Sequence, residues 1–303
     1  KVHLTVGRSA PAGSFMPVLA ASEAGYFKNH GLDVELQMMA PPVANQGLVS
    51  GTLDIYEGAT SVVTAILGGA DLVYVAAPVD LNTQQLVGTP GLTTLDSLRG
   101  KTVATLSAGA FGEIALRWSA KKAGLQVGKD ITPLFHPTAE AALATFMAGK
   151  ADSILTPPPF ILQAQQGGKN PVIVDYYKEG LRVVGPGTAV THDFLRKNPN
   201  ALKLFLMGYL DGLKRVIDDP AYAKQLDIKY AKLDPDLAEA DYREALRQWN
   251  KNMVVVPEAI QVTLDASEDP KARTAKAADF FDNSLIEAVN RDYGAKLFPN
   301  DVK

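Results

Sequence analysis

Apolar and polar residues follow two different periods along the chain, and these predict strands and helices in turn. Short apolar runs such as LVYVA and GKTVA are typical of buried strands. The segments between such runs carry apolar residues at helical spacing, as in EIALRWSAKKAGL. The resulting order is strand, helix, strand, helix, strand, helix, strand. We therefore predict an α/β fold with parallel sheets and crossover helices.

This order occurs twice, with a separation of 98 residues. The stretch QGLVSGTLDI at 46–55 matches ATFMAGKADS at 144–153, and three pairs of positions correspond: Leu48 with Phe146, Gly51 with Gly149, and Asp54 with Asp152. Two copies of so long a period predict a duplicated lobe rather than a solenoid. Because ligands of open parallel sheets bind outside the carboxyl ends of the strands, we expect two such edges to enclose a cleft.

The last third of the chain is predicted to be mostly helical. Asn198-Pro199 is an N-cap and first-turn pair, and it opens an apolar stripe that continues to Ile217. Further helices are predicted over residues 236–252, 256–266 and 275–292. We interpret the stripes as core that covers the lobes, the alternative being a partner-binding groove.

Composition narrows the possible functions. With 303 residues, 47% hydrophobic and 21% charged, the chain can bury a large core in two lobes. The net charge is -3, and Lys and Arg are scattered, so we expect no nucleic-acid partner and no basic membrane patch. No apolar stretch approaches the roughly 18 residues of a membrane span. Cysteines are absent and the four histidines lie far apart, so we expect no metal and no cofactor.

A turn of small residues follows the first strand of each copy, VGRSAPAGSF in one and ATLSAGAFGE in the other. One interpretation is steric, because Gly109 permits a tight turn and Ser107 caps a helix. The other is chemical, because N–H groups at a helix start bind anions when they face a cleft. The repeat favours the chemical interpretation, since similar turns stand at equivalent points.

Five stretches resemble the periplasmic solute-binding proteins of ABC importers, of the nitrate, sulfonate and taurine type, which are similar in turn to proteins that bind thiamine-pyrimidine precursors. The stretches are FMPVLAASEAGYFKNHGLDVELQ, SGTLDIYEGATSVVTAILGGADLVYVA, LDSLRGKTVATLSAGAFGE, AEAALATFMAGKAD and THDFLRKNPNALKLFLMGYLDGLKRVIDDP. The stretches follow one another in the expected order, and the similarity covers nearly the whole chain.

The resemblance implies a type II periplasmic binding fold, with two duplicated α/β lobes, a hinge, an interlobe cleft and added C-terminal helices. Lobe 1 would comprise residues 1–86 and 188–303, and lobe 2 residues 87–187. The hinge crossings would fall near 85–89 and 182–188. It also implies a periplasmic or lipid-anchored location, and a permease of the inner membrane as partner. We expect a monomer, and an N-terminal strand with any signal peptide absent from this chain.

The function that the resemblance implies is capture of a small organic anion, a sulfonate, carboxylate or aromatic acid, for delivery to the permease. A pyrimidine or thiamine precursor is the alternative ligand. We expect no enzyme, because the sequence has no G-x-S-x-G elbow, phosphate loop or metal triad, although some enzymes share the fold. A sensory module would normally carry a DNA-binding or membrane segment, and neither appears.

Candidate ligand-binding residues lie in the turns after predicted strands. Arg8 suits bidentate binding of an acid, hydroxyl residues can cap helices or donate to a ligand, and aromatic residues can pack or stack on it. The chain departs from the family at Arg8, at the turn 59–62 and at the prolines 157–159. Asp54 and Glu57 are expected to serve turns or face solvent. The predicted site comprises Arg8, Ser9, Phe15, Pro41, Thr60, Ser61, Asp80, Ser107, Gly109, Phe111, His136, Thr138, Thr156 and Phe160.

Overall fold

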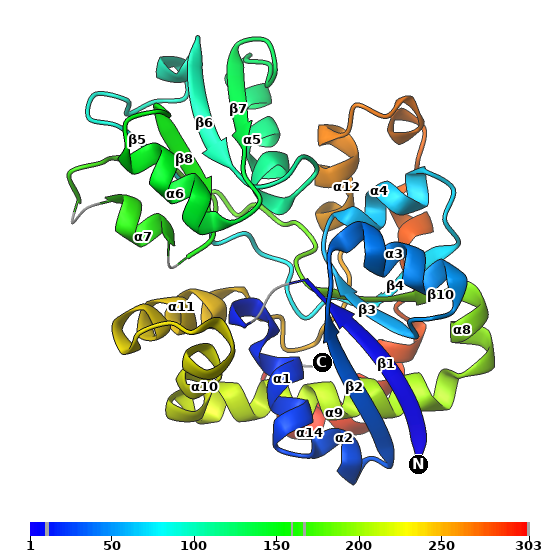
Figure 1. The fold of residues 1–303 in the computed structure, drawn as a ribbon. Helices are drawn as coiled ribbons and strands as arrows, with labels where there is room; N and C mark the ends of the chain where they lie inside the picture. The colour runs from blue at the N-terminus through cyan, green and yellow to red at the C-terminus, as the bar shows by residue number, and fades with distance from the viewer. Residues whose placement is uncertain (10–11, 159, 166–167, 302–303) are drawn as a thin grey trace. The chain divides into compact units, whose positions relative to one another are not determined.

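A computed structural model describes residues 1–9, 12–158, 160–165 and 168–301, so Pro159 and residues 10–11 of the first turn lie outside the described residues. The chain divides into two compact units (Figure 1). Unit 1 comprises Lys1–Asp80, Val184–Gln261 and Thr274–Lys303, and unit 2 comprises Leu81–Val183 and Val262–Arg273. The segment 262–273, which the sequence prediction gives to lobe 1, therefore packs with unit 2.

Unit 1 contains a five-stranded sheet in the order β2-β1-β3-β10-β4. The strands are β1 (Val2–Arg8), β2 (Leu32–Met38), β3 (Ile55–Gly58), β4 (Leu72–Ala76) and β10 (Gly187–Thr191). The first three are parallel, and β10 is antiparallel to β3 and β4. Its α-helices are α1 (Met16–Glu23), α2 (Tyr26–Asn29), α3 (Pro41–Ser50), α4 (Ser61–Leu67), α8 (His192–Lys197), α9 (Pro199–Asp218), α10 (Pro220–Leu226), α11 (Pro235–Gln248), α13 (Ser284–Val289) and α14 (Ala295–Leu297).

Unit 2 contains a second five-stranded sheet in the order β7-β6-β8-β5-β9. Its strands are β5 (Gln85–Gly88), β6 (Lys101–Thr105), β7 (Ile131–Phe135), β8 (Ser153–Thr156) and β9 (Val172–Asp175). Strand β6 is parallel to β7 and β8, and β5 is antiparallel to β8 and β9. The helices are α5 (Phe111–Lys122), α6 (Ala139–Met147) and α7 (Phe160–Gln165), and α12 (Pro257–Ala266) runs from the residues of unit 1 into those of unit 2.

Short 3₁₀ and π-helical turns complete the chain. The 3₁₀ turns are Gly13–Phe15, Asp96–Leu98, Pro270–Arg273 and Ala277–Phe280, and the π-helical turns are Asp227–Ala231 and Asn290–Gly294. The predicted order of seven alternating elements is confirmed in both copies, from β1 to β4 and from β6 to β9.

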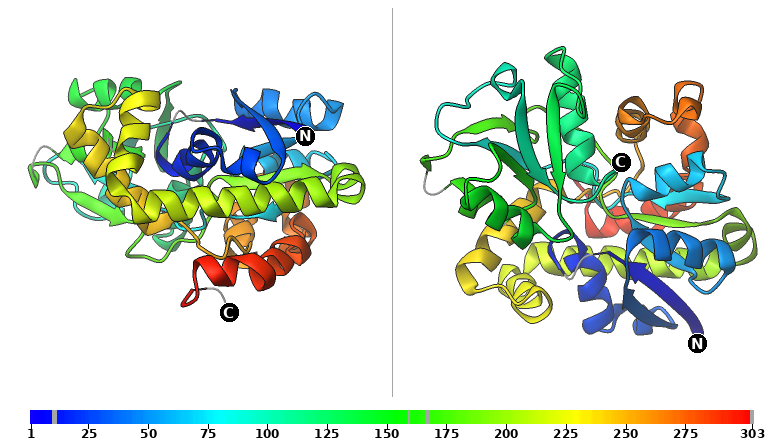
Figure 2. Two further views of the ribbon diagram at one scale, coloured as in Figure 1. Left: turned by 90° about the horizontal axis from the view of Figure 1, so that it is seen from below. Right: turned by 45° about the horizontal axis from the view of Figure 1, so that its top comes forward.

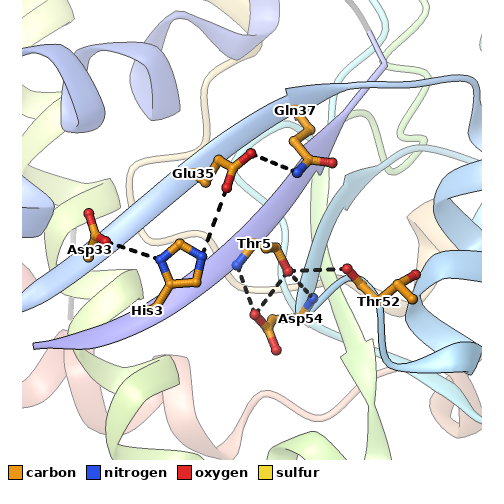
Figure 3. A network of polar contacts seen from close by, with 7 residues as sticks. All are labelled: His3, Thr5, Asp33, Glu35, Gln37, Thr52 and Asp54. Carbon is orange, nitrogen blue, oxygen red and sulfur yellow. Dashed lines mark hydrogen bonds and ion pairs between the residues drawn. The ribbon is translucent and has the colours of Figure 1, made fainter.

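The duplication extends to individual hydrogen bonds. In unit 1, Asp54 Oδ2 accepts from the Thr5 N–H at 2.8 Å and from Thr5 Oγ1 at 3.0 Å (Figure 3). In unit 2, Asp152 Oδ2 accepts from the Thr102 N–H and Oγ1, both at 2.9 Å. Each aspartate thus ties the start of the third strand of its copy to the first strand. Asp54 was predicted to serve a turn or face solvent, and its side chain instead bonds to Thr5 of β1.

The core of unit 1 centres on the contact between α1 and α9, and Figure 2 shows α9 along its length. The rings of Phe27 and Phe205 stack with centroids 4.9 Å apart. Gly212 of α9 lies directly against the α1 backbone, because a Cβ built there would stand 2.1 Å from the Pro17 carbonyl oxygen. The apolar stripe from Leu202 is therefore core, as predicted.

One predicted helix is wrong and another is shorter than predicted. Residues 275–292 do not form one helix, because Phe281 is extended and pairs with Tyr74 of β4, whose carbonyl accepts from the Asp282 N–H at 2.8 Å. This added pairing overrides the local helical pattern. Helix α11 ends at Gln248 rather than 252, while α9 and α12 agree closely with prediction.

Candidate functional site

Parallel strands bring the predicted site residues of each unit to the carboxyl edge of its sheet. In unit 1 the last residue of β1, Arg8, stands in register with Met38 of β2 and Glu57 of β3. In unit 2 the last residues of β6 and β7 stand in register. All predicted residues lie in these strand ends or in the segments that follow them: Arg8, Ser9, Phe15, Pro41, Thr60, Ser61 and Asp80 in unit 1, and Ser107, Gly109, Phe111, His136, Thr138, Thr156 and Phe160 in unit 2.

Arg8 is a largely buried cation at the edge of unit 1. The residue is only 7% exposed, and its Cζ lies 5.8 Å from the centre of the Tyr230 ring. Burial lowers the pKa of Arg8, and the interaction with Tyr230 offsets part of this effect. Tyr230 belongs to the π-helical turn Asp227–Ala231 and donates to Glu23. The sequence prediction missed Tyr230, because nothing local in the sequence places a residue of the last third beside β1.

Hydroxyl groups gather around Tyr56 on β3. Tyr56 is fully buried, and burial raises the pKa of its hydroxyl, while the nearby hydroxyls of Ser9 and Ser61 offset part of the rise. Two predicted residues, from the turns after β1 and β3, thus lie near one phenol, although Tyr56 Oη and Ser61 Oγ make no hydrogen bond to the described residues. Thr60 holds the N-cap position of α4 but makes no capping bond through its side chain.

Glu57 is buried, so the expectation that it serves a turn or faces solvent is wrong. Glu57 is 0% exposed. Its Oε1 accepts a hydrogen bond from Thr188 Oγ1 at 2.9 Å, and its Oε2 has no hydrogen-bond partner among the described residues. Burial raises the pKa of Glu57 to about 8, and the bond from Thr188 offsets part of the rise. Its strand lies inside the sheet, paired with both β1 and β10, so Glu57 has no open sheet edge beside it.

A pair of acids holds the turn that follows β1. Asp227 Oδ1 accepts from the Gly13 N–H at 2.9 Å, and a Cβ built on Gly13 would lie 3.1 Å from Asp241 Oδ2. Asp227 is fully buried, and burial raises the pKa of both carboxyl groups. The neighbouring acids Asp227 and Glu244 raise the pKa of Asp241 further. The pair is therefore expected to share a proton at neutral pH.

This proton makes stability depend on pH. Each raised pKa means that the folded protein holds a proton that the unfolded aspartates, with a pKa of about 3.9, release. Stability is then lost as the pH rises above about 4. In Asp241→Asn the amide donates to Asp227 without a titrating proton. The parent should lose free energy of unfolding between pH 5 and 8, and Asp241→Asn should lose less. We expect the difference to be about 1.4 kcal/mol for each unit by which folding raises the pKa of Asp241.

Denaturant unfolding at a series of pH values measures this difference. The matched control is Asp236→Asn, because Asp236 is an exposed acid on the same helix, α11. The control should show the pH profile of the parent. A profile of Asp241→Asn that is parallel to the parent's would show that the two acids do not share a proton.

The turn after β6 already holds an anion that the chain itself supplies. The Gly109 N–H donates to Glu113 Oε2 at 2.5 Å, and Glu113 Oε1 accepts from Arg117 Nε at 3.0 Å and Nη2 at 2.8 Å. Glu113 is 4% exposed. Helix α5 has Ala110 at its N-cap and no capping side chain, so the prediction that Ser107 caps it is wrong. The acid three residues after the N-cap is a sequence signal that could have identified Glu113.

Three buried polar atoms at the edge of unit 2 have no hydrogen-bond partner among the described residues. They are Gln84 Oε1, Thr105 Oγ1 and Thr156 Oγ1. A Cβ built on Gly112, in the first turn of α5, would lie 2.9 Å from Thr105 Oγ1 and 3.1 Å from Gln84 Oε1. Because unsatisfied buried polar atoms are costly, this group is suited to bind a polar partner. Of the three, the sequence prediction includes only Thr156.

The other predicted residues of unit 2 have structural partners. His136 Nε2 bonds to Thr145 Oγ1 at 2.8 Å and Nδ1 to the Leu134 carbonyl at 2.9 Å, so both ring nitrogens are engaged. Thr138 caps α6 by accepting from the Ala141 N–H. Phe111 packs on the core of unit 2. These contacts favour structural roles over ligand contact.

The remaining predicted residues differ in exposure. Phe15 is 5% exposed and belongs to the core of unit 1, and Asp80 is also buried. Ser9 and Ser107 are exposed, while Pro41 and Phe160 are half-buried first residues of α3 and α7.

In the part of the chain that the structure describes, no three His, Asp or Glu side chains form a group that could hold a metal ion. No helix among residues 1–9, 12–158, 160–165 and 168–301 is both long and apolar enough to span a bilayer.

Several solved structures share this fold. The alkanesulfonate-binding protein SsuA from Xanthomonas axonopodis pv. citri, bound to MOPS, is 19% identical, with a TM-score of 0.74 over 93% of this chain and 98% of that one. The periplasmic nitrate-binding protein NrtA from Synechocystis PCC 6803 is 15% identical, with a TM-score of 0.70 over 100% and 92%. The enzyme DszB, as a variant in complex with biphenyl-2-sulfinic acid, is 14% identical, with a TM-score of 0.67 over 96% and 99%.

The TM-scores and coverages of these matches establish the fold, which is that of periplasmic binding proteins, as predicted. No curated protein matches the sequence. The model of one protein family matches residues 12–223, which include the strands of both sheets except β1, all of α9 and part of α10. This match, over more than half of the sequence, shows that the chain belongs to the NMT1/THI5-like family.

Proposed function

We propose that this protein is the extracytoplasmic solute-binding component of an ABC importer and that it captures a small organic anion. The observation that carries the proposal is the placement of buried polar groups at the carboxyl edges of the sheets. Arg8 is a buried cation at one edge, and Gln84, Thr105 and Thr156 present unsatisfied polar atoms at the other. Burying the three unpartnered atoms of Gln84, Thr105 and Thr156 is unfavourable unless a partner satisfies them, and a bound solute supplies one.

The nature of the solute is proposed from Arg8 and from two proteins of the same fold. A guanidinium group forms paired, charge-assisted hydrogen bonds with a carboxylate or sulfonate. SsuA is named for binding alkanesulfonate and NrtA for binding nitrate, both anions. We propose a sulfonate, carboxylate or aromatic acid, whose acidic group lies against Arg8 with Ser9, Thr60 and Ser61 nearby.

The partner and location follow from the same proposal. The solute would pass to a permease in the inner membrane, and the protein would act as a monomer in the periplasm or anchored to the outside of that membrane. SsuA from Escherichia coli and NrtA are periplasmic proteins. We also propose that the two lobes meet at residues 86/87 and 187/188. The hinge strands would then be residues 85–89 and 182–188.

A pyrimidine-like solute is the second candidate. The unsatisfied Gln84 amide and the hydroxyls of Thr105 and Thr156 can pair with the ring nitrogens and amino group of such a heterocycle. Catalysis is the third possibility, since DszB shares the fold. We favour binding without chemistry, because the hydroxyl that lies against an imidazole, Thr145 Oγ1 beside His136 Nε2, already donates to the Ala141 carbonyl, and His136 Nδ1 bonds to the Leu134 carbonyl.

Native mass spectrometry of the purified protein, followed by thermal-shift screening of organic acids and pyrimidines, tests the proposal. We expect one small solute that raises the melting temperature, because it binds the folded state alone. The released solute should have the same mass before and after incubation with the protein. Steady formation of a product would contradict the proposal, and so would the absence of any stabilising compound.

A further inference from the structure

The N-terminus of α5 differs from an open anion site in one respect. Such a helix start attracts anions through its N–H groups and the positive end of the helix dipole. Here Glu113 already stands at that place, with Oε2 2.5 Å from the Gly109 nitrogen. A second acidic group beside this buried carboxylate would be repelled.

Glu113 is held in this position from its other side. Arg117, one helical turn further on, binds Glu113 Oε1 through Nε and Nη2 and binds Glu268 Oε1 through Nη1 at 2.7 Å. Both Glu113 and Glu268 raise the pKa of Arg117, against a lowering by burial, so its guanidinium stays charged. The carboxylate is thus neutralised within the unit and does not require a cationic ligand.

The atoms left for a ligand at this edge are uncharged. Thr105 Oγ1 and Gln84 Oε1 come within about 3 Å of a Cβ built on Gly112, and the residues are 0% and 6% exposed. Both lack a hydrogen-bond partner among the described residues, as does Thr156 Oγ1. A hydroxyl can donate or accept and the Gln84 amide oxygen accepts, so together they match N–H and O–H groups.

We propose that Glu113 is a built-in anion that excludes acidic groups from the start of α5 and makes the edge of unit 2 select a neutral hydrogen-bonding group, such as an amide, hydroxyl or ring N–H. This inference rests on the proposed function and deepens it: the solute presents a neutral polar group to Gln84, Thr105 and Thr156 of unit 2. Glu113 acts as a specificity-determining residue without touching the solute.

Inorganic sulfate tests this assignment without knowledge of the solute. The variants are made in an Arg8→Ala background, which removes the buried cation of unit 1, and sulfate is titrated by calorimetry against a sodium chloride blank of equal ionic strength. Adding Glu113→Ala should tighten sulfate binding by about tenfold or more, because the helix start is then open to an anion. Glu113→Gln keeps an acceptor for the Gly109 N–H and removes the charge, so a smaller gain of about threefold is expected.

Glu268→Ala is the matched control, because it releases Arg117 from an exposed partner and leaves Glu113 in place. It should leave sulfate affinity unchanged. A gain as large as that of Glu113→Ala would assign the effect to Arg117 and overturn the proposal, as would unchanged affinity in both Glu113 variants. Failure to find any solute would contradict the proposed function but would not alter these sulfate titrations.

Discussion

Arg8→Ala is expected to weaken solute binding by tenfold or more while leaving the fold intact. A charge-assisted hydrogen bond contributes about 1.5 to 3 kcal/mol, and 1.4 kcal/mol corresponds to a tenfold change in affinity. Arg8 is 7% exposed at the end of β1, so the charge that the substitution removes is largely buried. Calorimetry with the identified solute measures the effect.

Two further variants test whether the guanidinium group of Arg8 causes the loss of solute binding. Arg8→Lys keeps the charge but loses the planar fork, so we expect an intermediate loss. Arg99→Ala removes an arginine that is exposed and paired with Asp130, and it should bind like the parent. Circular dichroism checks that each variant folds. Binding by folded Arg8→Ala within about twofold of the parent would remove Arg8 from the site.

Gly212→Ala is expected to destabilise the protein by about 3 kcal/mol, near the upper end of the usual range for overpacking a core. The added Cβ would stand 2.1 Å from the Pro17 carbonyl oxygen, 2.7 Å from the Ala21 nitrogen and 2.9 Å from the Ala21 Cβ. None of these atoms can rotate away, so α1 and α9 must separate. Since α1 follows the turn that carries Gly13, solute binding should weaken as well.

Gly47→Ala is the control for the substitution itself. Gly47 lies within α3, and its added Cβ would meet Leu53 Cβ at 3.2 Å, which a small shift relieves, and Thr52 Oγ1 at an ordinary contact distance of 3.5 Å. Alanine also favours helix over glycine by about 1 kcal/mol, so stability should be nearly unchanged. Denaturant unfolding compares the two variants. Equal stabilities would show that α1 and α9 do not pack backbone against backbone.

The fold could be predicted from the sequence because its main signals are local and repeated. Apolar period and turn residues define the seven alternating elements of each copy, and the match of Asp54 with Asp152 anticipated two aspartates with the same hydrogen bonds to Thr5 and Thr102. The helix predicted over 275–292 failed where a long-range pairing, between Phe281 and Tyr74, replaced the local preference.

The site was less predictable, because its chemistry depends on contacts between distant segments. The strand ends placed Arg8 and Thr156 correctly at the sheet edges, but Tyr230 and Asp227 come from a turn more than 200 residues after β1. The burial of Glu57 depends on pairing with β10, far along the chain. Only Glu113 had a local signal, its position three residues after the N-cap.

Equilibrium dialysis with the solute identified by mass spectrometry tests the central claim most directly. The account predicts saturable binding of one solute molecule per chain, weakened tenfold or more by Arg8→Ala, with all of the solute recovered chemically unchanged. Binding that does not saturate, binding that is indifferent to Arg8, or recovery of an altered compound would contradict it.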